Sequence, residues 1–373
     1  MIPFNRPSFD GKELAYLAEA VAQGHTAGNG QFSRRAEALL EGIQGRGTAL
    51  VTTSCTHALE LTARLIDLQP GDEVIVPSFT FVSTASAFVW NGARPVFADV
   101  RPDTLNMDPK SAESLINDRT RAICLVHYAG VAAEPDKFLD LANRHGLILI
   151  EDNAHGLGST YQGRALGTFG AASALSFHET KNVTCGEGGA ILVNDPLLVE
   201  RAEILRDKGT DRSRFLRGQV DKYTWVDVGS SWVMSDLLAG VLVGQLERFD
   251  EIQRRRHAIW ARYLRELAPW ATSEGALLPV VPSDCGHSAH MFHLRLANPP
   301  RRDAFIEHMR SRGVLVVFHY QTLHDSPLGR TLGPTRPCPH SSQAAGTLVR
   351  LPLFSSMSEG EQSRVIEAVQ TFA

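Results

Sequence analysis

The middle of the chain alternates between two hydrophobic periods. Short, continuous apolar runs recur between residues 48 and 195, and helical patterns such as residues 56–68 and 135–146 lie between several of them. The runs are "TALVTTS", "DEVIVPS", "RPVFADV", "RAICLVH", "LILIEDN", "ASALSFH" and "GAILVND". Continuous apolar strands are typical of a sheet that is buried on both faces. We therefore predict an α/β fold with a mainly parallel, doubly wound sheet and right-handed crossovers.

The hydrophobic pattern changes near Ser235. The segment "SDLLAGVLVGQLERFDEIQRRRHAIWARYLREL" predicts a long amphipathic helix, and we expect its "RRRH" run, residues 254–257, on a solvated face. After it, "HMFHLRL" and "GVLVVFHY" predict strands of a smaller α+β domain, and "HDSPLGRTLGPTRPCPH" predicts a surface loop. The expected division is a large domain over residues 1–245 and a small C-terminal domain over residues 246–373.

Composition argues against several classes of protein. The 373 residues are 43% apolar and 21% charged, with a net charge of −4, so we expect no nucleic-acid-binding surface. The five cysteines are an odd number without a CxxC pair, which argues against a disulfide framework or a structural zinc site. The N-terminus lacks the pattern of a signal peptide, and no apolar run reaches ~18 residues. We expect a cytoplasmic protein that does not span a membrane.

The predicted strand ends carry polar residues. In open parallel sheets the ligand site lies beyond the carboxyl ends of the strands. At one such end, "ALVTTSCTHALEL" places Ser54 and Thr56 where a helix begins, and either could be the N-cap. The free N–H groups of a helix N-terminus suit a phosphate, although ordinary capping explains the segment equally well.

Two further strand ends leave the same kind of choice. In "LILIEDNAHGLGS", Glu151 and Asp152 could cap a turn, or one of them could direct a carboxylate into the site. In "PSFTFVSTASAF", Phe79 and Phe81 could belong to the core or form a platform for a flat ring. For an aromatic residue taken alone, the core is the more common location.

The run "LSFHETKNVTCGEGG" contains a lysine in unusual surroundings. Lys181 follows a predicted core strand and precedes a glycine turn. A phosphate site, a strand-end acid, an aromatic ring and a lysine on neighbouring strand ends are what pyridoxal 5′-phosphate requires. The lysine forms a Schiff base with the aldehyde, and the acid keeps the pyridine nitrogen protonated so that the ring accepts electrons.

Other interpretations of these residues have less support. The run "FHE" contains His178 and Glu179, and His127 and His155 lie further upstream. No HExxH motif or close His/Cys pair joins these residues, so no metal is predicted. "GEGG" lacks the spacing of a dinucleotide-binding turn. We expect these glycines to let the backbone pass close to the cofactor.

The motifs together resemble the DegT/StrS-type nucleotide-sugar aminotransferases, which are fold-type I pyridoxal-phosphate enzymes. The resemblance runs nearly end to end, and "SFHETKN" followed by "GEGG" is specific to this group. The other segments that carry it are "IPFNRP", "SCTHALEL", "PGDEVIVPSFTFVSTA", "VRPDTLNMD", "VHYAGVA", "RGQVDKYTW" and "LPLF". Within the family, the chain is most similar to the dTDP-4-amino-4,6-dideoxygalactose transaminases of enterobacterial common antigen synthesis.

The resemblance implies roles for individual residues. Lys181 corresponds to the Schiff-base lysine, Asp152 to the partner of the pyridine nitrogen and Phe81 to the ring stacked on the cofactor. Further contacts with the cofactor are implied for Cys55, Thr56, His155 and Ser176, and contacts with the sugar for Lys222, Tyr223, His319 and Tyr320. Many relatives have an asparagine where this chain has Val233, so Ser230 or Ser231 would have to replace its contact with the neighbouring subunit's phosphate.

The resemblance also implies a reaction. It is the transfer of an amino group from L-glutamate to dTDP-4-keto-6-deoxy-D-glucose, in a homodimer with shared sites. Alternatives are an aminotransferase for another keto-sugar nucleotide, a sugar dehydratase, or a non-catalytic ligand-binding protein. The dehydratases of the family have histidine in place of the lysine, and a non-catalytic protein could lose Lys181 or Asp152, so the retention of both favours an aminotransferase.

Overall fold

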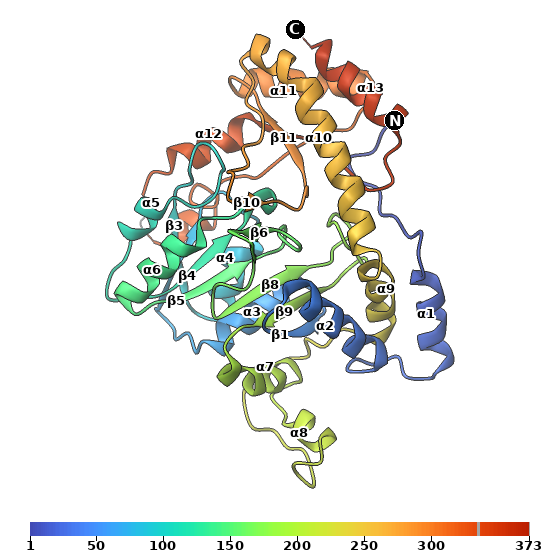
Figure 1. The fold of residues 1–373 in the computed structure, drawn as a ribbon. Coiled ribbons are helices and arrows are strands. Elements are labelled where there is room, and N and C mark those ends of the chain that lie inside the picture. The colour runs from blue at the N-terminus through green and yellow to red at the C-terminus, as the bar shows by residue number, and fades with distance from the viewer. Residues whose placement is uncertain (334–335, 373) are drawn as a thin grey trace.

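A seven-stranded sheet forms the centre of the larger part of the molecule (Figure 1). The structure is a computed structural model and describes residues 1–333 and 336–372. Its strand order is β1-β9-β8-β5-β4-β2-β3, and β9 is antiparallel to both of its neighbours while the remaining pairs are parallel. The strands are β1 Thr48–Thr52, β2 Glu73–Pro77, β3 Arg94–Ala98, β4 Thr120–Val126, β5 Ile148–Asp152, β8 Ala172–Ser176 and β9 Gly189–Val193. Each coincides with one of the predicted apolar runs, which confirms the predicted sheet.

Helices cover both faces of this sheet, because alternate strand residues point to opposite sides. One face packs on α3, α4 and α7, and the other packs on α1, α2 and α9 at the β1 end and on α5 and α6 around β4. These helices are α1 Glu13–Ala22, α2 Gln31–Gln44, α3 Cys55–Leu65, α4 Ser83–Trp90, α5 Pro109–Glu113, α6 Pro135–His145, α7 Val199–Arg206 and α9 Asp236–Leu246. The result is the three-layer, doubly wound arrangement predicted for continuous apolar strands.

Helix ends follow local sequence signals. Ser54 caps α3, because its Oγ accepts a hydrogen bond of 3.1 Å from the backbone N–H of His57. At α6, Pro135 occupies the first turn and Gly146 ends the helix in the left-handed region at φ 64°. Of the two candidate caps for α3, Ser54 is therefore the correct one.

A second, smaller sheet has the order β11-β13-β12 and is antiparallel. Its strands are β11 Phe292–Arg295, β12 Val317–Phe318 and β13 Leu348–Leu351, and the helices near it are α10 Phe249–Glu274, α11 Pro299–Ser311, α12 Pro339–Thr347 and α13 Glu359–Gln370. Short pieces complete the chain: β6 Thr160–Tyr161, β7 Arg164–Ala165, β10 Cys285–Gly286, η1 Tyr128–Gly130, η2 Pro196–Leu198 and η3 Gly329–Thr331. The predicted boundary at residue 245 stays a prediction, although a separate apolar cluster does form around the second sheet.

The N-terminal segment belongs to that second cluster. Ile2 is buried in it, donates a backbone hydrogen bond of 2.7 Å to Gly313 and accepts one of 3.0 Å from Leu315. Arg6 forms a salt bridge of 3.1 Å with Glu361 on α13. Figure 1 accordingly shows both chain ends at the same end of the molecule.

The long amphipathic helical stretch predicted from Ser235 onward is formed by two helices, α9 and α10, separated at residues 247–248. One prediction within it is wrong. Arg256, expected on a solvated face, is buried and donates hydrogen bonds to the carbonyl oxygens of Ala289 at 3.2 Å and His290 at 2.6 Å. The predicted surface loop at 324–340 includes residues 334–335, which lie outside the described residues, and η3 occupies part of the rest.

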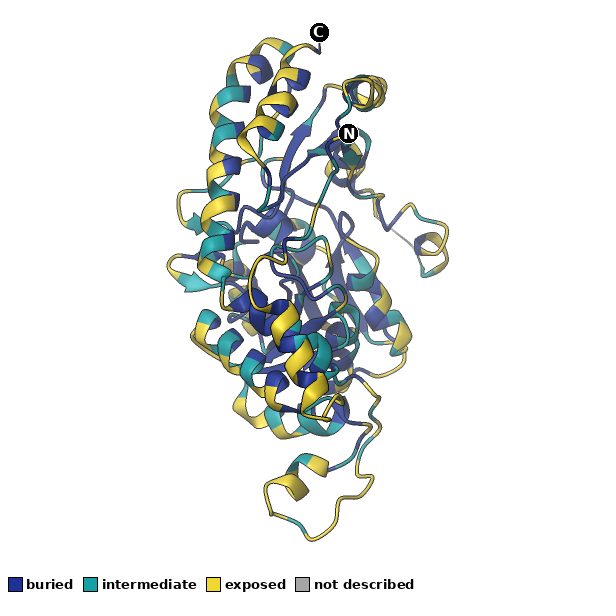
Figure 2. Ribbon diagram, turned by 90° about the vertical axis from the view of Figure 1, so that its right-hand side faces the viewer, coloured by how far each residue is buried: buried dark blue, intermediate teal, exposed yellow. Residues whose placement is uncertain are grey.

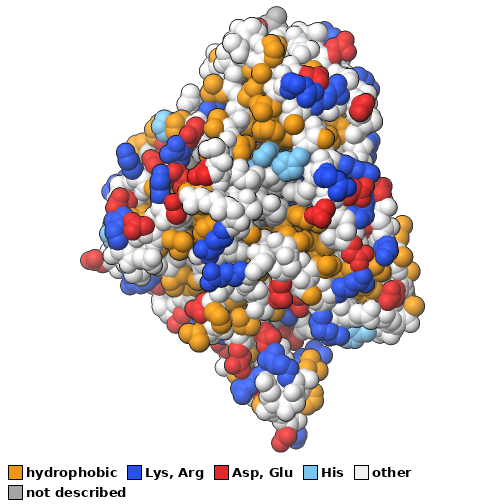
Figure 3. All heavy atoms as spheres, viewed as in Figure 1, with side chains coloured by type: hydrophobic (Ala, Val, Ile, Leu, Met, Phe, Trp, Pro, Cys, Tyr) orange, Lys and Arg blue, Asp and Glu red, His pale blue; other side chains and the backbone are white. Residues whose placement is uncertain are grey.

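One segment projects away from the body of the molecule. We call residues 211–229 the arm; it contains α8 Arg212–Leu216 and lies at the lower end of Figure 1. Figure 2 shows that most of this segment is exposed. Exposed apolar side chains on it are Phe215, Leu216, Tyr223, Trp225, Val226 and Val228. Figure 3 shows charges of both signs interspersed over the face seen in Figure 1.

Candidate active site

The N-terminus of α3 forms the floor of the site. The backbone N–H groups of Cys55 and Thr56 have no hydrogen-bond acceptor among residues 1–333 and 336–372, and the hydroxyl of Thr56 contacts Ser83 Oγ at 2.7 Å. Gly189, at the start of β9, passes so close that a Cβ there would lie 2.3 Å from the carbonyl carbon of Ser54. It is paired with Ser176, the last residue of β8. The last glycine of "GEGG", Gly189, thus lets the backbone approach this helix start.

Asp152 ends β5 and is buried in the site. Its Oδ2 accepts a hydrogen bond of 2.7 Å from Thr84 Oγ1, and its Oδ1 accepts one of 3.2 Å from the N–H of Ala154. Burial raises the pKa of Asp152, while these hydrogen bonds and the charge of Lys181 oppose the rise. The two hydrogen bonds only partly offset the cost of burying the carboxylate of Asp152. A nearby cation therefore stabilises its charged form.

Glu151, the preceding residue, has a different role. Both of its oxygens are saturated, with hydrogen bonds to His127 Nε2 at 2.9 Å and to the N–H groups of Gly167, Phe169 and Gly170 at 2.7–2.8 Å. Because β5 alternates its side chains between the two faces of the sheet, Glu151 supports the fold from the opposite side. Of the two acids, only Asp152 lies in the site.

Lys181 lies in the loop between β8 and β9, close to Asp152. Burial lowers the pKa of Lys181 to about 8, against the opposing effects of Cys55 and Asp152, and Arg350 lowers it further. The side chain is only partly buried. At neutral pH, a pKa of about 8 leaves roughly a tenth of the amine uncharged, far more than for an ordinary lysine. The structure thus gives Lys181 the partial desolvation that a nucleophilic amine requires.

The residue after Lys181 attaches the loop to α10 and to the segment before β11. Asn182 Nδ2 donates to the carbonyl oxygen of Ser288 at 2.8 Å and to Gln253 Oε1 at 3.0 Å. Since both partners are acceptors, the orientation of the amide is fixed, and Oδ1 accepts from Nδ1 of His290 at 2.9 Å. Sequence reasoning missed this attachment.

Two strained turns, one after β4 and one before β11, meet beside the site. Ala129, just after β4, has φ 57°, and Ala289 has φ 48°. Arg256 holds the carbonyl of Ala289, and Ser288 Oγ donates a hydrogen bond of 2.6 Å to the carbonyl of His155. A non-glycine residue in the left-handed region carries a cost of order 1–3 kcal/mol. The surrounding hydrogen bonds maintain these conformations.

Aromatic and imidazole rings form the wall of the site. His155 stacks on His290 with centroids 4.3 Å apart, and its Nδ1 is buried without a partner among the described residues. Tyr320 lies 3.5 Å from His155 Nε2, and His319 Nδ1 is 3.0 Å from Tyr128 Oη. Burial lowers the pKa of His155, His290 and His319 well below the ordinary value, so these rings are neutral.

The two candidate phenylalanines differ in burial. Phe79 is buried, with its ring centroid 5.3 Å from that of Tyr128, and belongs to the core. Phe81 is 55% exposed and lies 6.0 Å from the ring of Tyr320. Phe81 is therefore the ring available to a ligand.

Arg350 on β13 is a further residue that sequence reasoning missed. It acts electrostatically on Lys181, His155, His319 and Tyr320. A lone arginine inside the apolar run "TLVRLPLF" was the available signal.

Three predicted site residues lie outside this constellation in the single chain. Lys222 and Tyr223 are exposed on the arm, and Ser230 is exposed at its base. Val233, where the resemblance implies an asparagine in many relatives, forms a bridge with Thr52 and packs against Gly28. The structure brings together Cys55, Thr56, Phe81, Asp152, His155, Ser176, Lys181, His319 and Tyr320.

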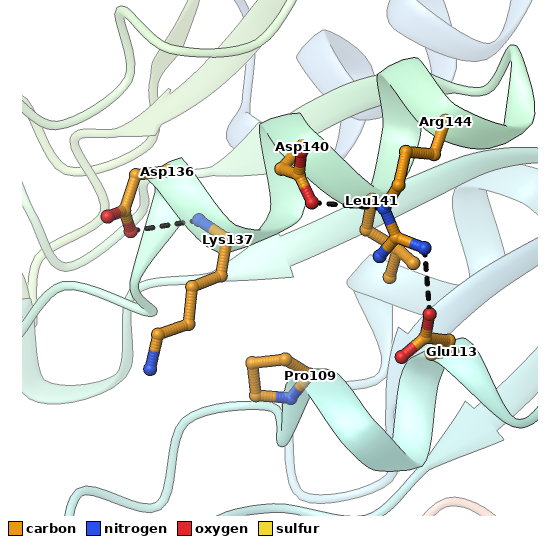
Figure 4. A pocket seen from close by; sticks show the side chains of 7 residues that line it. All are labelled: Pro109, Glu113, Asp136, Lys137, Asp140, Leu141 and Arg144. Atoms are coloured by element: carbon orange, nitrogen blue, oxygen red, sulfur yellow. Dashed lines mark hydrogen bonds and ion pairs between the residues drawn. The ribbon is translucent and has the colours of Figure 1, made fainter.

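One hollow away from this site lacks such chemistry. It has a volume of about 360 Å³ and lies between α5 and α6, where Glu113 and Asp140 are both paired with Arg144 (Figure 4). In the described part of the chain, no group of three His, Cys, Asp or Glu side chains could hold a metal ion. None of the described helices is long and apolar enough to cross a membrane.

The site fits pyridoxal 5′-phosphate. The free N–H groups at the start of α3 suit its phosphate, Asp152 suits its ring nitrogen, and the unpartnered Nδ1 of His155 is available to a polar substituent. A lysine with a lowered pKa completes the set. The fold and site together define a fold-type I pyridoxal-phosphate enzyme.

Comparison with known proteins identifies the family. The chain matches the DegT/DnrJ/EryC1/StrS aminotransferase family over residues 7–370, and it belongs to this family of pyridoxal-phosphate-dependent aminotransferases. The aminotransferase TlmJ from Streptoalloteichus hindustanus is 32% identical, with a TM-score of 0.91 over 99% of this chain and 98% of that one. DesV from S. venezuelae, solved in complex with a ketimine intermediate, is 32% identical, with a TM-score of 0.89 over 99% and 97%.

A third relative supports the cofactor. The putative sugar aminotransferase Spr1654 from Streptococcus pneumoniae, in its PMP-form, is 25% identical, with a TM-score of 0.92 over 100% of this chain and 99% of that one. The same protein has been solved in a PLP-form. The predicted fold and cofactor are confirmed.

Proposed function

We propose that the enzyme transfers an amino group from L-glutamate to C4 of dTDP-4-keto-6-deoxy-D-glucose, giving dTDP-4-amino-4,6-dideoxy-D-galactose. The observation that carries the proposal is the amine of Lys181, partly desolvated beside Asp152 and the start of α3. A keto sugar as acceptor is supported by the sugar aminotransferase among its relatives. The nucleotide and the position of the amine rest on the motif resemblance to the enterobacterial common antigen transaminases.

Residues of one chain would hold most of the cofactor. Cys55 and Thr56 N–H groups with the Ser176 hydroxyl would bind the phosphate, Phe81 would cover the ring and His155 would meet its 3′-oxygen. When bound, pyridoxal phosphate supplies an aldehyde that accepts the amino group and a ring that takes up the electron pair left on the reacting carbon. Asp152 keeps a proton on the ring nitrogen, which maintains that capacity.

Lys181 moves the protons. Its Nζ would hold the bound cofactor through the aldehyde, and it would become a free amine once the donor amine takes its place. The free amine would remove the α-proton of glutamate; the amino group would stay with the cofactor, and water would supply the keto oxygen of the departing 2-oxoglutarate. In the second half-reaction the same Nζ delivers a proton to C4 of the sugar, and the face from which it acts sets the configuration of the amine.

The arm supports a shared site in a homodimer. Trp225 on the arm is 73% exposed and Trp90 at the end of α4 is 80% exposed, so both offer large apolar surfaces that a partner could cover. A groove of about 430 Å³ runs between α3, the end of α4 and residues 228–232 at the base of the arm. A twofold dimer would cover both surfaces and bring Lys222 and Tyr223 to the partner's sugar.

Spectroscopy and product analysis test the function. The purified enzyme with pyridoxal phosphate should be yellow, and L-glutamate alone should remove that absorbance as 2-oxoglutarate forms. Adding dTDP-4-keto-6-deoxy-D-glucose should restore it, and proton couplings in the product should show an axial amine at C4. An equatorial amine, or an amine at C3 from a 3-keto sugar only, would assign the enzyme to another keto-sugar substrate. No response to glutamate would refute the proposed donor.

A further inference from the structure

Two buried threonines at the start of α4 form a chain of hydrogen bonds that ends on Asp152. The hydroxyl of Thr84 lies 2.8 Å from that of Thr80 and donates a hydrogen bond of 2.7 Å to Asp152 Oδ2. All three residues are buried, and sequence reasoning missed both threonines. Because an ionised carboxylate can only accept, the proton of the Thr84 hydroxyl faces Asp152, and Thr80 then donates to Thr84. The two hydroxyls therefore act on one carboxylate oxygen.

The hydroxyl of Thr84 does not serve its own helix. A threonine at a helix start commonly caps the helix, and one further inside commonly donates to the carbonyl oxygen four residues earlier. Thr62 in α3 follows the second pattern, because its Oγ1 donates to the carbonyl oxygen of Ala58 at 2.8 Å. Within the described part of the chain, Thr84 does neither, and α4 has no side-chain cap. Its hydroxyl is directed instead to a residue 68 positions away in the sequence.

The same short segment also reaches the start of α3. Ser83 Oγ lies 2.7 Å from the hydroxyl of Thr56, beside the free N–H groups proposed for the cofactor's phosphate. Through Thr84 the segment contacts the carboxylate proposed for the ring nitrogen. Residues 80–84 thus connect two groups that are proposed to bind different parts of one cofactor.

The hydrogen bond from Thr84 favours the charged form of Asp152. Burial raises the pKa of Asp152, and this hydrogen bond is the largest of the effects that oppose the rise. The other hydrogen bond to the carboxylate, from the N–H of Ala154, is longer at 3.2 Å. An ionised carboxylate stabilises a protonated ring nitrogen, whereas a neutral carboxyl group does not. Thr84 therefore supports the form of Asp152 that a protonated ring requires.

We propose that Thr84 is a positioning residue that holds the carboxylate of Asp152 in place and ionised for the ring nitrogen of pyridoxal phosphate, with Thr80 supporting it. The inference rests on the proposed role of Asp152 in the aminotransferase. Thr84 would act on the cofactor only through Asp152. Its removal should therefore matter for a ring that contains the nitrogen and not for a ring that lacks it.

Binding to the cofactor-free protein tests this distinction. The two ligands are pyridoxal phosphate and its analogue with C–H in place of the ring nitrogen, and calorimetry measures both. In Thr84→Val, which keeps the shape of the side chain, Kd for pyridoxal phosphate should rise about tenfold, as expected for one lost hydrogen bond to a charged group. Kd for the analogue should not rise. Thr84→Ser retains a hydroxyl and should bind both ligands like wild type.

Turnover gives a second readout. In Thr84→Val, kcat should fall by about 10-fold to 100-fold, while the half-saturating glutamate concentration stays within about threefold. Thr80→Val should show the same pattern with an effect of about threefold on Kd, so it tests the inference even if Thr84→Val does not fold. Thr62→Val is the matched control, because it removes a buried helical hydroxyl that does not contact Asp152. It should change neither binding nor kcat.

Asp152→Asn separates this inference from the role on which it rests. It should weaken the binding of pyridoxal phosphate and not that of the analogue. If it affects both ligands equally or neither, the proposed role of Asp152 fails. If Asp152→Asn distinguishes the two ligands but Thr84→Val and Thr80→Val do not, the threonines only pack α4 against the sheet, and this inference alone is wrong.

Discussion

The lysine loop and the arm both extend from the large sheet, but they differ in how they are attached to the rest of the chain. The loop at residues 177–188 is attached to distant segments, through Asn182 to Ser288 and through Glu179 to Asn5. The arm is held by contacts near its own base, such as the salt bridge of 2.9 Å between Arg217 and Glu203. Its aromatic side chains remain exposed. The difference indicates that contacts within one chain are enough to position Lys181. They do not cover the exposed aromatic side chains of the arm.

The largest expected effect comes from the lysine itself. Lys181→Ala should abolish turnover and the covalent attachment of cofactor while the fold survives, because no other amine lies where Lys181 does. Borohydride reduction of the wild-type enzyme followed by peptide mapping should find the pyridoxyl group on Lys181. A label on any other lysine would refute the assignment.

Asp152 should have the next largest effect. In Asp152→Asn the ring nitrogen is no longer held protonated, so kcat should fall by several powers of ten while cofactor binding weakens less. Glu151→Gln is the matched control, because it should lower thermal stability rather than act on chemistry. Activity of Asp152→Asn within about tenfold of wild type, a barrier change of ~1.4 kcal/mol, would leave Asp152 as a structural residue.

Mixed dimers test the arm directly. A Lys181→Ala subunit and a subunit altered at both Lys222 and Tyr223 should each be inactive as homodimers. After random exchange at equal amounts, about a quarter of all sites would combine an intact lysine with an intact arm from the partner. Partial activity should therefore return. Complete exchange, shown by differently tagged subunits, without recovery of activity would mean that each chain builds its own site.

A smaller effect is expected at the attachment of the loop. Asn182→Ala removes three hydrogen bonds and should lower kcat by about tenfold, since Lys181 would be less well positioned. Hydrogen exchange should quicken in residues 177–188 and not in the arm. Equal exchange in both proteins would show that Asn182 does not hold the loop.

The smallest expected effect is a shift in the pH at which Lys181 reacts with an amine-reactive reagent. In the cofactor-free protein, an amine-reactive reagent should label Lys181 with a midpoint near pH 8, because burial lowers its pKa to about 8. A free lysine derivative blocked at its α-amino group, added to the same sample, should react only as pH approaches about 10.4. Labelling rates of the Lys181 peptide and of this reference compound are measured together. Coincident midpoints would contradict a desolvated Lys181.

The sequence permits prediction of features that depend on local order. The seven strands follow from continuous apolar runs, and Lys181, Asp152 and His155 meet because their strands end at one edge of the sheet. Glu151 and Asp152 could not be separated by pattern alone, since the outcome depends on which face of β5 each occupies.

Features that depend on distant contacts were missed. Asn182 bonds Ser288, 106 residues away. Arg350 acts electrostatically on the site because the small sheet packs beside Tyr128. Arg256 was misplaced for the same reason, because its partners Ala289 and His290 belong to a strained turn that no local signal announces.

The docking of Ile2 has a consequence for how the molecule is made. The pairing partners of Ile2, Gly313 and Leu315, are synthesised more than 300 residues after it. During translation Ile2 must therefore remain undocked until the segment that contains Leu315 has left the ribosome. The apolar cluster around the second sheet then closes over a segment made long before it, which is a contact of very high sequence separation.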